Sequence, residues 1–386
     1  MSEHIPQRFI GLMSGTSLDG IDIVCAQFSS GSEPCFIEAS NTYPFSATIQ
    51  EKIKRLMAPG NNEIWLAGQL DRELGEVFAD AINQFLTEFN ISADSVTAIG
   101  SHGQTIRHHP EAEKSFTLQI GDPNTIAMQT GIDVIADFRR KDIALGGEGA
   151  PLVPAFHRDI FSAETDRVIV NIGGFANLTT LPGRNESATI QQVTGFDTGP
   201  GNTLLDQWFT AHNHRTSTDM FDRDGAWSEQ GTLLPELLKA FMADPYFSRP
   251  APKSTGREYF NLSWLAQFDV ERYAPVDVQT TLTHLTARSI IEAIVPLSDN
   301  AELLLCGGGS HNKHLVRLIG EYYRQLTQNP ILQAGNVGND GMSPDDVEAA
   351  AFAWLAKQFL ANKPGNVPAV TGASAEAVLG SLTKAN

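Results

Sequence analysis

Residues 8–28 read RFIGLMSGTSLDGIDIVCAQF. Two β-prone runs, Arg8–Met13 and Ile21–Phe28, flank a small, polar, glycine-rich connection. The connection ends in Asp19-Gly20, a favoured hairpin dipeptide, because glycine takes a positive φ without steric cost. This stretch therefore predicts two neighbouring strands joined by a glycine-rich turn.

The same plan returns in the middle of the chain. The apolar run Arg167–Asn171 is followed by Gly173-Gly174 and then by the run Ala176–Leu181. The two regions share this order of strand, glycine-rich turn and strand, but they share no sequence repeat. Helical spacing of apolar residues and helix-start residues predict helices elsewhere. The expected helices lie at about 46–57, 63–89, 123–130, 202–212, 233–243, 279–294, 313–326 and 343–360, with further strands at 96–101, 117–120 and 302–306.

Length and element order predict an α/β protein of two domains. A chain of 386 residues is long for a single core. Charged residues, glycine and proline cluster at 137–151 and mark the boundary. We expect residues 1–137 to form the first lobe, with 361–386 packing back on it, and residues 138–360 to form the second. Small ligands favour the cleft between two such domains.

Charge limits the possible partners. The chain has 45 acidic and 27 basic residues and a net charge of −18, which disfavours nucleic acid or an anionic membrane as a partner. A bound phosphate must be held by local backbone N–H groups, helix N-termini and a metal ion. The chain has three cysteines and no C-x-x-C spacing, and it lacks an apolar export signal and a membrane-length apolar run. These features predict a cytoplasmic protein.

Three glycine-rich turns follow predicted strands. They are Gly15–Gly20, Gly173-Gly174 and Gly307–Gly309. Glycine lets the backbone approach a ligand, and exposed N–H groups bind phosphate oxygens. The sequence contains neither the P-loop pattern nor G-x-G-x-x-G after the first strand, which disfavours both of those nucleotide folds.

Several polar residues lie beside these turns. Asp197, in a stretch with little other charge, is either a general base or a turn and cap residue before the helix at Asn202. His102 beside Gln104 indicates hydrogen bonding, since no zinc-ligand spacing is present. Arg139-Arg140-Lys141 is either a solvated run or a contact for a substrate carboxylate. Glu348 lies on an apolar helical stretch and is either solvent-exposed or partnered.

Together these motifs resemble those of the anhydro-N-acetylmuramic acid kinase family. The similarity runs in order from about Arg8 to Ala373. Phe9–Asp22 and Gly195–Asn202 are its most specific blocks. The remaining blocks are Ser101–Thr105, Asp137–Pro154, Asn171–Leu178, Gly307–Asn312 and Asn339–Trp354.

The resemblance implies a fold, a reaction and a set of site residues. The fold would be two ribonuclease-H-like lobes of the actin/hexokinase/heat-shock-chaperone type around an ATP cleft. The reaction would open the 1,6-anhydro ring of the sugar with water and phosphorylate O6 with ATP and Mg²⁺, in cell-wall recycling, in a homodimer. Asp197 would be the catalytic residue, and His102, Gln104, Asp122 and Glu348 would contact the sugar. The nucleotide would be held by Gly15, Thr16, Ser17, Leu18, Asp19, Gly20, Ile21, Asp22, Asn171, Gly173, Gly174, Asn177, Gly307, Gly308 and Gly309.

Elementary chemistry agrees with this reaction. Cleaving an acetal usually needs an acid for the leaving oxygen and a base for water. Here the leaving O6 can be captured by the γ-phosphoryl group, so a single base such as Asp197 suffices. Two alternatives stay open from the residues alone: an ordinary sugar kinase of the same fold, and a non-catalytic, ATP-switched binding protein.

Overall fold

The computed structural model describes residues 7–15, 18, 20–29, 35–185, 188–213, 219–251, 253–257, 259–327, 334–336 and 342–385. The chain divides into two compact units, one of residues 1–160 with 346–386 and the other of residues 161–345. The division differs from the expected one, because residues 138–160 and 346–360 belong to the first unit. Each unit is described by itself below.

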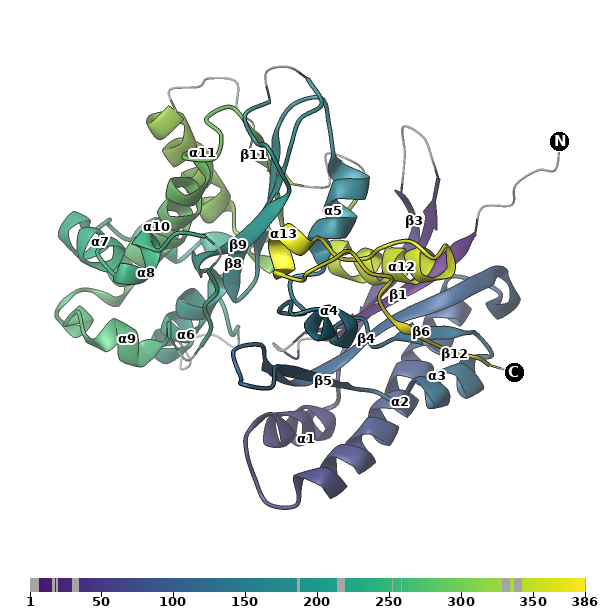
Figure 1. Cartoon of the computed structure of the whole chain (residues 1–386). Coiled ribbons are helices and arrows are strands. Elements are labelled where there is room, and N and C mark those ends of the chain that lie inside the picture. The colour runs from purple at the N-terminus through teal and green to yellow at the C-terminus, as the bar shows by residue number, and fades with distance from the viewer. Residues whose placement is uncertain are drawn as a thin grey trace. The chain divides into compact units, whose positions relative to one another are not determined.

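The first unit is built on a mixed sheet with the strand order β12-β6-β4-β1-β2-β3, and β5 pairs with β4. Strands β1, β2 and β3 are antiparallel neighbours, whereas β4 and β6 run parallel to β1. Helix α12 covers one face of this sheet, and α1, α2 and α3 lie on the other (Figure 1). The strands are β1 (Arg8–Ser14), β2 (Ile21–Phe28), β3 (Cys35–Tyr43), β4 (Val96–His109), β5 (Phe116–Ile120), β6 (Val134–Ala136) and β12 (Ser381–Thr383). The helices are α1 (Ala47–Met57), α2 (Glu63–Glu88), α3 (Pro123–Thr130), α4 (Arg140–Ala144), α5 (Val153–Phe161), α12 (Val347–Leu360) and α13 (Pro368–Thr371).

Helix α12 belongs to the first unit because two glycines let it approach the sheet. A Cβ on Gly11 of β1 would lie 1.8 Å from the carbonyl oxygen of Ala349, and one on Gly100 of β4 would lie 2.0 Å from that of Phe352. The helix is apolar nearly all round, so it must be covered on several sides. Its close contact with β1 and β4 places residues 346–360 in this unit.

A buried carboxylate ties residues 138–160 to the C-terminal segment. Asp142 is fully buried and accepts hydrogen bonds from the Asn366 side-chain amide at 2.7 Å and the Thr371 hydroxyl at 2.8 Å. It also accepts one from the backbone N–H of Gly149 at 2.8 Å. A carboxyl group this deeply buried needs such partners, which explains why both segments fold with the first unit.

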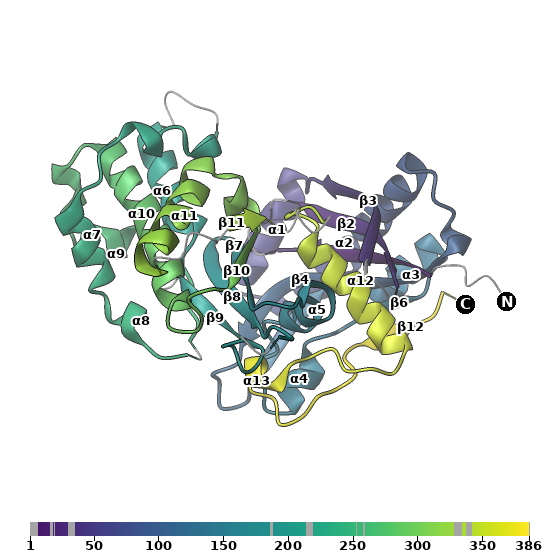
Figure 2. The same cartoon turned by 90° about the horizontal axis from the view of Figure 1, so that it is seen from above.

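The second unit contains a five-stranded sheet of order β11-β10-β7-β8-β9. Strands β7, β8 and β9 are antiparallel neighbours, and β10 and β11 run parallel to β7. Its helices gather beside the sheet in the two views of Figures 1 and 2. The strands are β7 (Arg167–Ile172), β8 (Phe175–Leu181), β9 (Thr194–Pro200), β10 (Glu302–Cys306) and β11 (Ala334–Asn336). The helices are α6 (Asn202–Asn213), α7 (Pro235–Met242), α8 (Pro245–Ser248), α9 (Leu262–Ala266), α10 (Pro275–Ile294) and α11 (Lys313–Thr327).

Both sheets share one strand order. If each sheet's main strands are numbered along the chain, both read 3-2-1-4-5, with strands 1 to 3 antiparallel and strands 4 and 5 parallel to strand 1. This is the ribonuclease-H-like arrangement that the resemblance implied for each lobe. The prediction of an α/β fold with two such lobes is confirmed.

Strand β4 corrects one expectation. The strand was predicted to end at Ser101, with His102 and Gln104 following it in a connection. It continues to His109 and pairs with β5 from Gln104 onward. Gly103, with φ of 70°, makes room for the neighbouring strand β5, because a Cβ at this position would lie 2.7 Å from the carbonyl oxygen of Ile120. His102 and Gln104 are therefore held within a strand.

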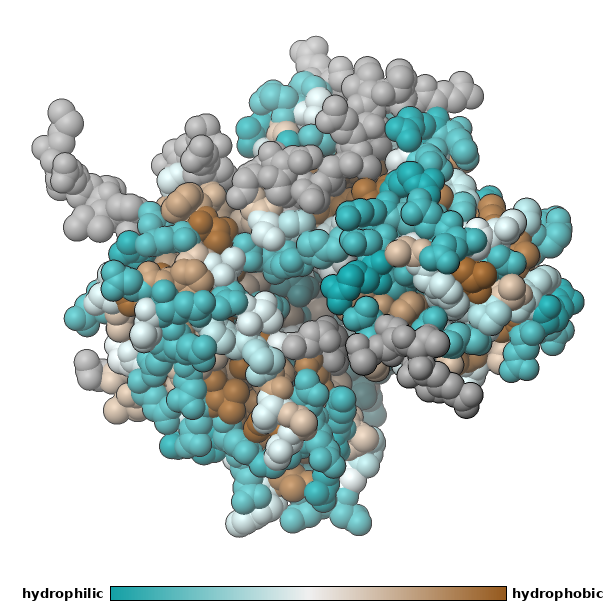
Figure 3. Space-filling view, turned by 180° about the vertical axis from the view of Figure 1, so that it is seen from behind, coloured by the Kyte–Doolittle hydropathy of each residue, from teal (hydrophilic) through white to brown (hydrophobic). Residues whose placement is uncertain are grey.

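The surface is largely hydrophilic on the face drawn in Figure 3, with smaller hydrophobic patches between. Cys25 and Cys306 are buried. Within the ranges given above, no helix combines the length and the apolar character needed to cross a bilayer.

Buried histidines make the fold sensitive to mild acid. Burial lowers the pKa of His157 to about 3, and that of His284 to about 4. The unfolded chain accepts a proton on each histidine near pH 6.5, whereas the folded state excludes it. The free energy of unfolding is therefore highest above pH 6.5 and falls as the pH is lowered. We expect the exclusion of a proton from His157 alone to lower the free energy of unfolding by about 2 kcal/mol at pH 5, compared with its value above pH 6.5.

Urea unfolding at pH 7.5, 6.5 and 5.5 measures this loss, in a range where most carboxylates stay ionised. His157→Gln, which does not titrate, should show a shallower fall in unfolding free energy than the parent chain. Parallel falls in the two proteins would rule out a neutral, buried His157 as a cause.

Candidate active site

A row of polar side chains crosses the second unit's sheet. Asn171 on β7 is paired with Asn177 on β8, which is paired in turn with Asp197 on β9. Directly paired residues point to the same face of a sheet. All three are half-buried, whereas their neighbours Ile172 and Phe196 are buried in the core. The row therefore lies on the face of the sheet opposite to Ile172 and Phe196.

Asp197 is anchored by its surroundings. The backbone N–H of Thr255 donates to its Oδ2 at 3.0 Å, and its own N–H donates to the carbonyl of Lys253 at 3.0 Å. The hydroxyl of Tyr246 donates to its backbone carbonyl at 2.8 Å. Asp197 lies inside β9, and α6 begins only at Asn202, so it is not the cap of that helix. The carboxylate is oriented, which suits a group that must accept a proton from a fixed direction.

The setting of Asp197 includes a partly buried lysine and a buried tyrosine. The ammonium of Lys253 lies 4.8 Å from the ring centroid of Tyr246. Burial lowers the pKa of Lys253, and burial together with the charge of Asp197 raises the pKa of Tyr246. Tyr246 is therefore a neutral hydrogen-bond donor at physiological pH. No sequence motif marks these residues, because they reach β9 through tertiary packing.

Two of the glycine turns adjoin this row. Gly173-Gly174 joins β7 to β8, and the backbone N–H of Asn202 donates to the carbonyl of Gly173 at 2.9 Å. Gly307 has φ of 75°, and a Cβ there would lie 2.2 Å from Oδ1 of Asn171. A larger residue at Gly307 would therefore collide with the row. The geometry brings Asn171, both turns and the start of α6 to one end of the sheet.

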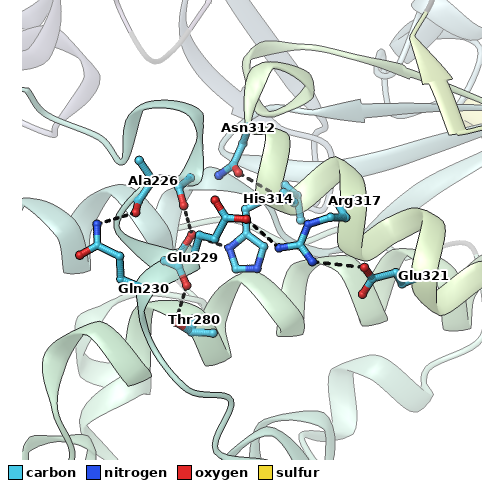
Figure 4. Close-up of polar contacts among 11 residues, drawn as sticks. Ala226, Glu229, Gln230, Thr280, Asn312, His314, Arg317 and Glu321 are labelled. Atoms are coloured by element: carbon cyan, nitrogen blue, oxygen red, sulfur yellow. Dashed lines mark hydrogen bonds and ion pairs between the residues drawn. The ribbon is translucent and has the colours of Figure 1, made fainter.

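A polar network holds the start of α11, the helix that follows the Gly307–Gly309 turn in the chain (Figure 4). Nδ1 of His314 lies 2.9 Å from Oγ of Ser228, and both residues are buried. The Thr280 hydroxyl donates to the carbonyl of Ser228 at 2.5 Å. Arg317, one turn further along α11, bridges Glu229 at 3.1 Å. The network fixes the helix that follows the turn. Nothing in the sequence marks His314 for this role, because its partner Ser228 is 86 residues away.

In the first unit, Gln104 holds the end of β1. It is fully buried, its Oε1 accepts a hydrogen bond from the Ser14 hydroxyl at 2.6 Å, and its Nε2 donates to the carbonyl of Gly15 at 3.3 Å. Gln104 thereby fixes the first residue of the glycine-rich connection. Leu18 within that connection has φ of 64°, a strained value for leucine that is typical of functional turns. Of the predicted nucleotide residues here, Thr16, Ser17 and Asp19 lie outside the described residues.

His102 and Arg139 form a pair that Glu348 supports electrostatically. Nδ1 of His102 lies 3.2 Å from the carbonyl of Ser14, and its Nε2 accepts a hydrogen bond from Arg139 at 2.9 Å. Burial and the charge of Arg139 lower the pKa of His102 to about 3, so its ring is neutral. Burial lowers the pKa of Arg139 to about 10, and the charge of half-buried Glu348 opposes that shift. Arg139 therefore remains a cation at neutral pH.

Asp122 has a structural role in the first unit. Its carboxylate accepts hydrogen bonds from the backbone N–H groups of Asn124 and Thr125 at 3.1 Å each, as the N-cap of α3. A sugar contact by Asp122 remains a prediction. The other predicted sugar contacts, in contrast, are linked to one another. His102 and Gln104 both contact Ser14, Arg139 contacts His102, and Glu348 acts on Arg139 by charge.

A metal site is not evident from protein ligands alone. Among the residues described by the structure, no group of three or more His, Cys, Asp or Glu is arranged to hold an ion. Mg²⁺ commonly keeps its waters and binds through substrate phosphates with one or two carboxylates. This mode suits an active site formed by backbone turns and a few carboxylates.

The chain matches proteins of known family over nearly its full length. Residues 7–385 match the family described as anhydro-N-acetylmuramic acid kinase. A relative of that name from Shewanella pealeana is 50% identical over 381 residues, covering 98% of this chain and 99% of the relative. One from Saccharophagus degradans is 48% identical over 384 residues, covering 98% of this chain and 99% of the relative. Among solved structures, the activator of the 2-hydroxyisocaproyl-CoA dehydratase from Clostridium difficile is 12% identical with a TM-score of 0.43, covering 91% of this chain and 97% of that chain. The sequence matches over both units establish that this chain belongs to the anhydro-N-acetylmuramic acid kinase family.

Proposed function

We propose that this enzyme opens the 1,6-anhydro ring of anhydro-N-acetylmuramic acid with water and transfers the γ-phosphoryl group of ATP to O6, giving N-acetylmuramic acid 6-phosphate for cell-wall recycling. Family membership over both units supports this activity. The observation that carries the mechanism is the oriented carboxylate of Asp197, which is held by the Thr255 N–H at one end of the Asn171–Asn177–Asp197 row.

In the proposed reaction Asp197 accepts a proton from the attacking water. The water bonds to the anomeric carbon as the bond from that carbon to O6 breaks, and O6 bonds to the γ-phosphorus as ADP leaves. No separate acid is needed, because phosphorus replaces the proton on the leaving oxygen. Backbone N–H groups at Gly173-Gly174 and Gly307–Gly309 would orient the phosphates.

We infer that Mg²⁺ enters with ATP, held chiefly by the phosphates. When bound, it neutralises charge on the transferred group. We also propose that the enzyme works as a homodimer in the cytoplasm, where ATP is available and where cysteine thiols stay reduced. Sedimentation at several protein concentrations tests the dimer, and a single species with the mass of one chain would contradict it.

The carboxylate of the substrate suggests a role for Arg139. We propose that this guanidinium binds the lactyl carboxylate, while Glu348, His102 and Gln104 contact or orient the sugar. Arg139→Gln should raise KM for the anhydro-sugar at least about 10-fold, the usual scale for a lost charged hydrogen bond. Steady-state kinetics with ATP saturating measures this change.

The adjacent Arg140 supplies a matched control. Its side chain is 67% exposed and pairs with Asp137, so Arg140→Gln should leave KM unchanged. A KM shift that is equal in both variants would assign the effect to general surface charge and not to a carboxylate contact. Circular dichroism of Arg139→Gln separates a binding defect from loss of fold, because His102 and Gly149 also contact this side chain.

An isotope experiment tests the reaction itself. In ¹⁸O-water, sampled by NMR before mutarotation, the product should carry the label at C1 and appear first as the α-anomer, because water attacks the face opposite O6. The phosphate ester bridge should stay unlabelled. An ordinary sugar kinase of this fold would leave the anhydro ring intact and place no solvent oxygen in the sugar. Unlabelled C1 in the early product would overturn the proposed mechanism.

A further inference from the structure

The first unit has a polar hollow away from the site residues discussed above. Its volume is about 450 Å³, within the usual range for small-molecule sites. One wall is a face of α5 that includes Arg158 and Asp159, and the other is a face of α12 that includes Lys357 and Gln358. Lys357 lies nine residues beyond Glu348, about 14 Å further along the helix axis. The hollow is thus separate from the predicted sugar contacts.

The end of α12 brings another cation to the hollow. The backbone N–H of Lys363 donates to the carbonyl of Gln358 at 2.9 Å, and that of Asn362 donates to Phe359 at 3.0 Å. With Asn362 in the left-handed region at φ of 53°, these two bonds form a Schellman motif. The motif turns the chain back on the helix, and Lys363 therefore lines the hollow with Lys357.

The charges around the hollow are out of balance. Arg158, Lys357 and Lys363 face two carboxylates, Asp159 and Glu376, in a chain whose net charge is −18. Asp159 is already engaged by the Trp354 indole, which donates to it at 2.7 Å. Glu376 pairs only loosely with Arg158, at 3.5 Å and with both groups about half-exposed. Burial lowers the pKa of Lys357; the charge of Asp159 opposes this shift, and the charge of Lys363 adds to it. A bound anion would neutralise these neighbouring cations.

Gln358 adds a requirement for a hydrogen-bond donor. Its side chain is 7% exposed and lines the hollow, and its Oε1 has no hydrogen-bond partner among the described residues. Leaving a buried acceptor unpaired is costly, so such a group marks a place where a ligand can donate. An N–H or O–H group is needed there, whereas the cations need a phosphate or carboxylate.

We propose that the hollow between α5, α12 and the C-terminal segment is a binding site for a small hydroxylated anion of the sugar-phosphate class. The anionic group lies against Lys357, Lys363 and Arg158, and a ligand hydroxyl donates to Oε1 of Gln358. This site is additional to the catalytic site and does not depend on the reaction proposed above.

Fluorine NMR of the full-length enzyme labelled with 5-fluorotryptophan tests the proposal. The chain has five tryptophans, and Trp354 lines the hollow, so one of five resonances should report on it. Trp354→Phe identifies that resonance. With the nucleotide site filled by a non-hydrolysable ATP analogue, glucose 6-phosphate should shift it saturably. Inorganic phosphate should bind more weakly, and glucose should cause no shift at equal concentration.

Variants separate the two parts of the proposed site. Lys357→Gln and Lys363→Gln should each weaken glucose 6-phosphate binding about 10-fold, as expected for loss of a charged contact, whereas Lys239→Gln, at an exposed position of α7, should not. Gln358→Leu should weaken binding of glucose 6-phosphate but not of inorganic phosphate. It should also raise the thermal midpoint of the free protein, because it removes the unpaired acceptor.

Three results would overturn the proposal. The first is a Trp354 resonance that does not respond to glucose 6-phosphate. The second is binding that is equal in the parent, Lys357→Gln and Lys363→Gln. The third is a shift that depends on protein concentration alone, which would assign the hollow to contact with a second copy of the chain.

Discussion

Asp197→Asn is expected to lower kcat at least about 100-fold, the scale for loss of a general base. Asparagine keeps the shape of the side chain, and its amide oxygen can still accept the hydrogen bond that the Thr255 N–H donates to Asp197. The amide cannot take a proton from water. The loss should therefore fall on the chemical step, while ATP affinity stays within about twofold of the parent.

Single-turnover kinetics with labelled ATP and calorimetry of nucleotide binding measure these two quantities separately. Asp219→Asn is a matched control, because it removes one carboxylate from the same unit at an exposed ion pair with Arg223. That variant should keep near-normal turnover. Turnover of Asp197→Asn within about tenfold of the parent, with solvent label still entering C1, would remove Asp197 from the base role.

Much of the architecture around Asp197 could be predicted from local sequence. The plan of strand, glycine turn and strand at residues 8–28 and 167–181 corresponds to β1-β2 and β7-β8, the antiparallel start of each sheet. These pairings are local, so turn chemistry and β propensity suffice to predict them. The catalytic role of Asp197 stays a proposal, although its place inside β9 excludes the alternative of a helix cap.

Long-range packing explains what could not be predicted. Helix α12 was predicted to lie in the second lobe but packs in the first. Its uniformly apolar sequence does not specify which sheet it covers, so local sequence could not assign it. The pairing of His102 with Arg139 joins residues 37 apart, and that of Ser228 with His314 joins residues 86 apart. Such contacts depend on tertiary register, to which helical or strand periodicity gives no guide. Arg139 is one of two adjacent arginines in the sequence, and only its partial burial distinguishes it from exposed Arg140.

The packing of α12 leads to the largest expected effect on stability. A Cβ on Gly11 would lie 1.8 Å from the carbonyl oxygen of Ala349 and 2.8 Å from the backbone nitrogen of Ala353. These are backbone atoms of a helix, so no side-chain rotation can relieve the collision. The helix must move away from β1, which would open contacts along its buried face. We expect Gly11→Ala to destabilise the first unit by more than about 4 kcal/mol, the range reached by severe overpacking. Gly100→Ala should act in the same way, because its Cβ would lie 2.0 Å from the carbonyl oxygen of Phe352.

Gly68 provides the matched control for the same chemical change. It lies exposed within α2, and a Cβ there would meet no atom within 4 Å. Alanine favours a helix more than glycine does, so Gly68→Ala should stabilise the protein by about 0.5–1 kcal/mol. Urea unfolding followed by tryptophan fluorescence measures all three variants, since Trp354 is buried on α12 itself. We expect the change in the free energy of unfolding to be positive for Gly68→Ala and negative for Gly11→Ala and Gly100→Ala. A midpoint for Gly11→Ala equal to that of the parent would show that α12 does not depend on this close approach to β1.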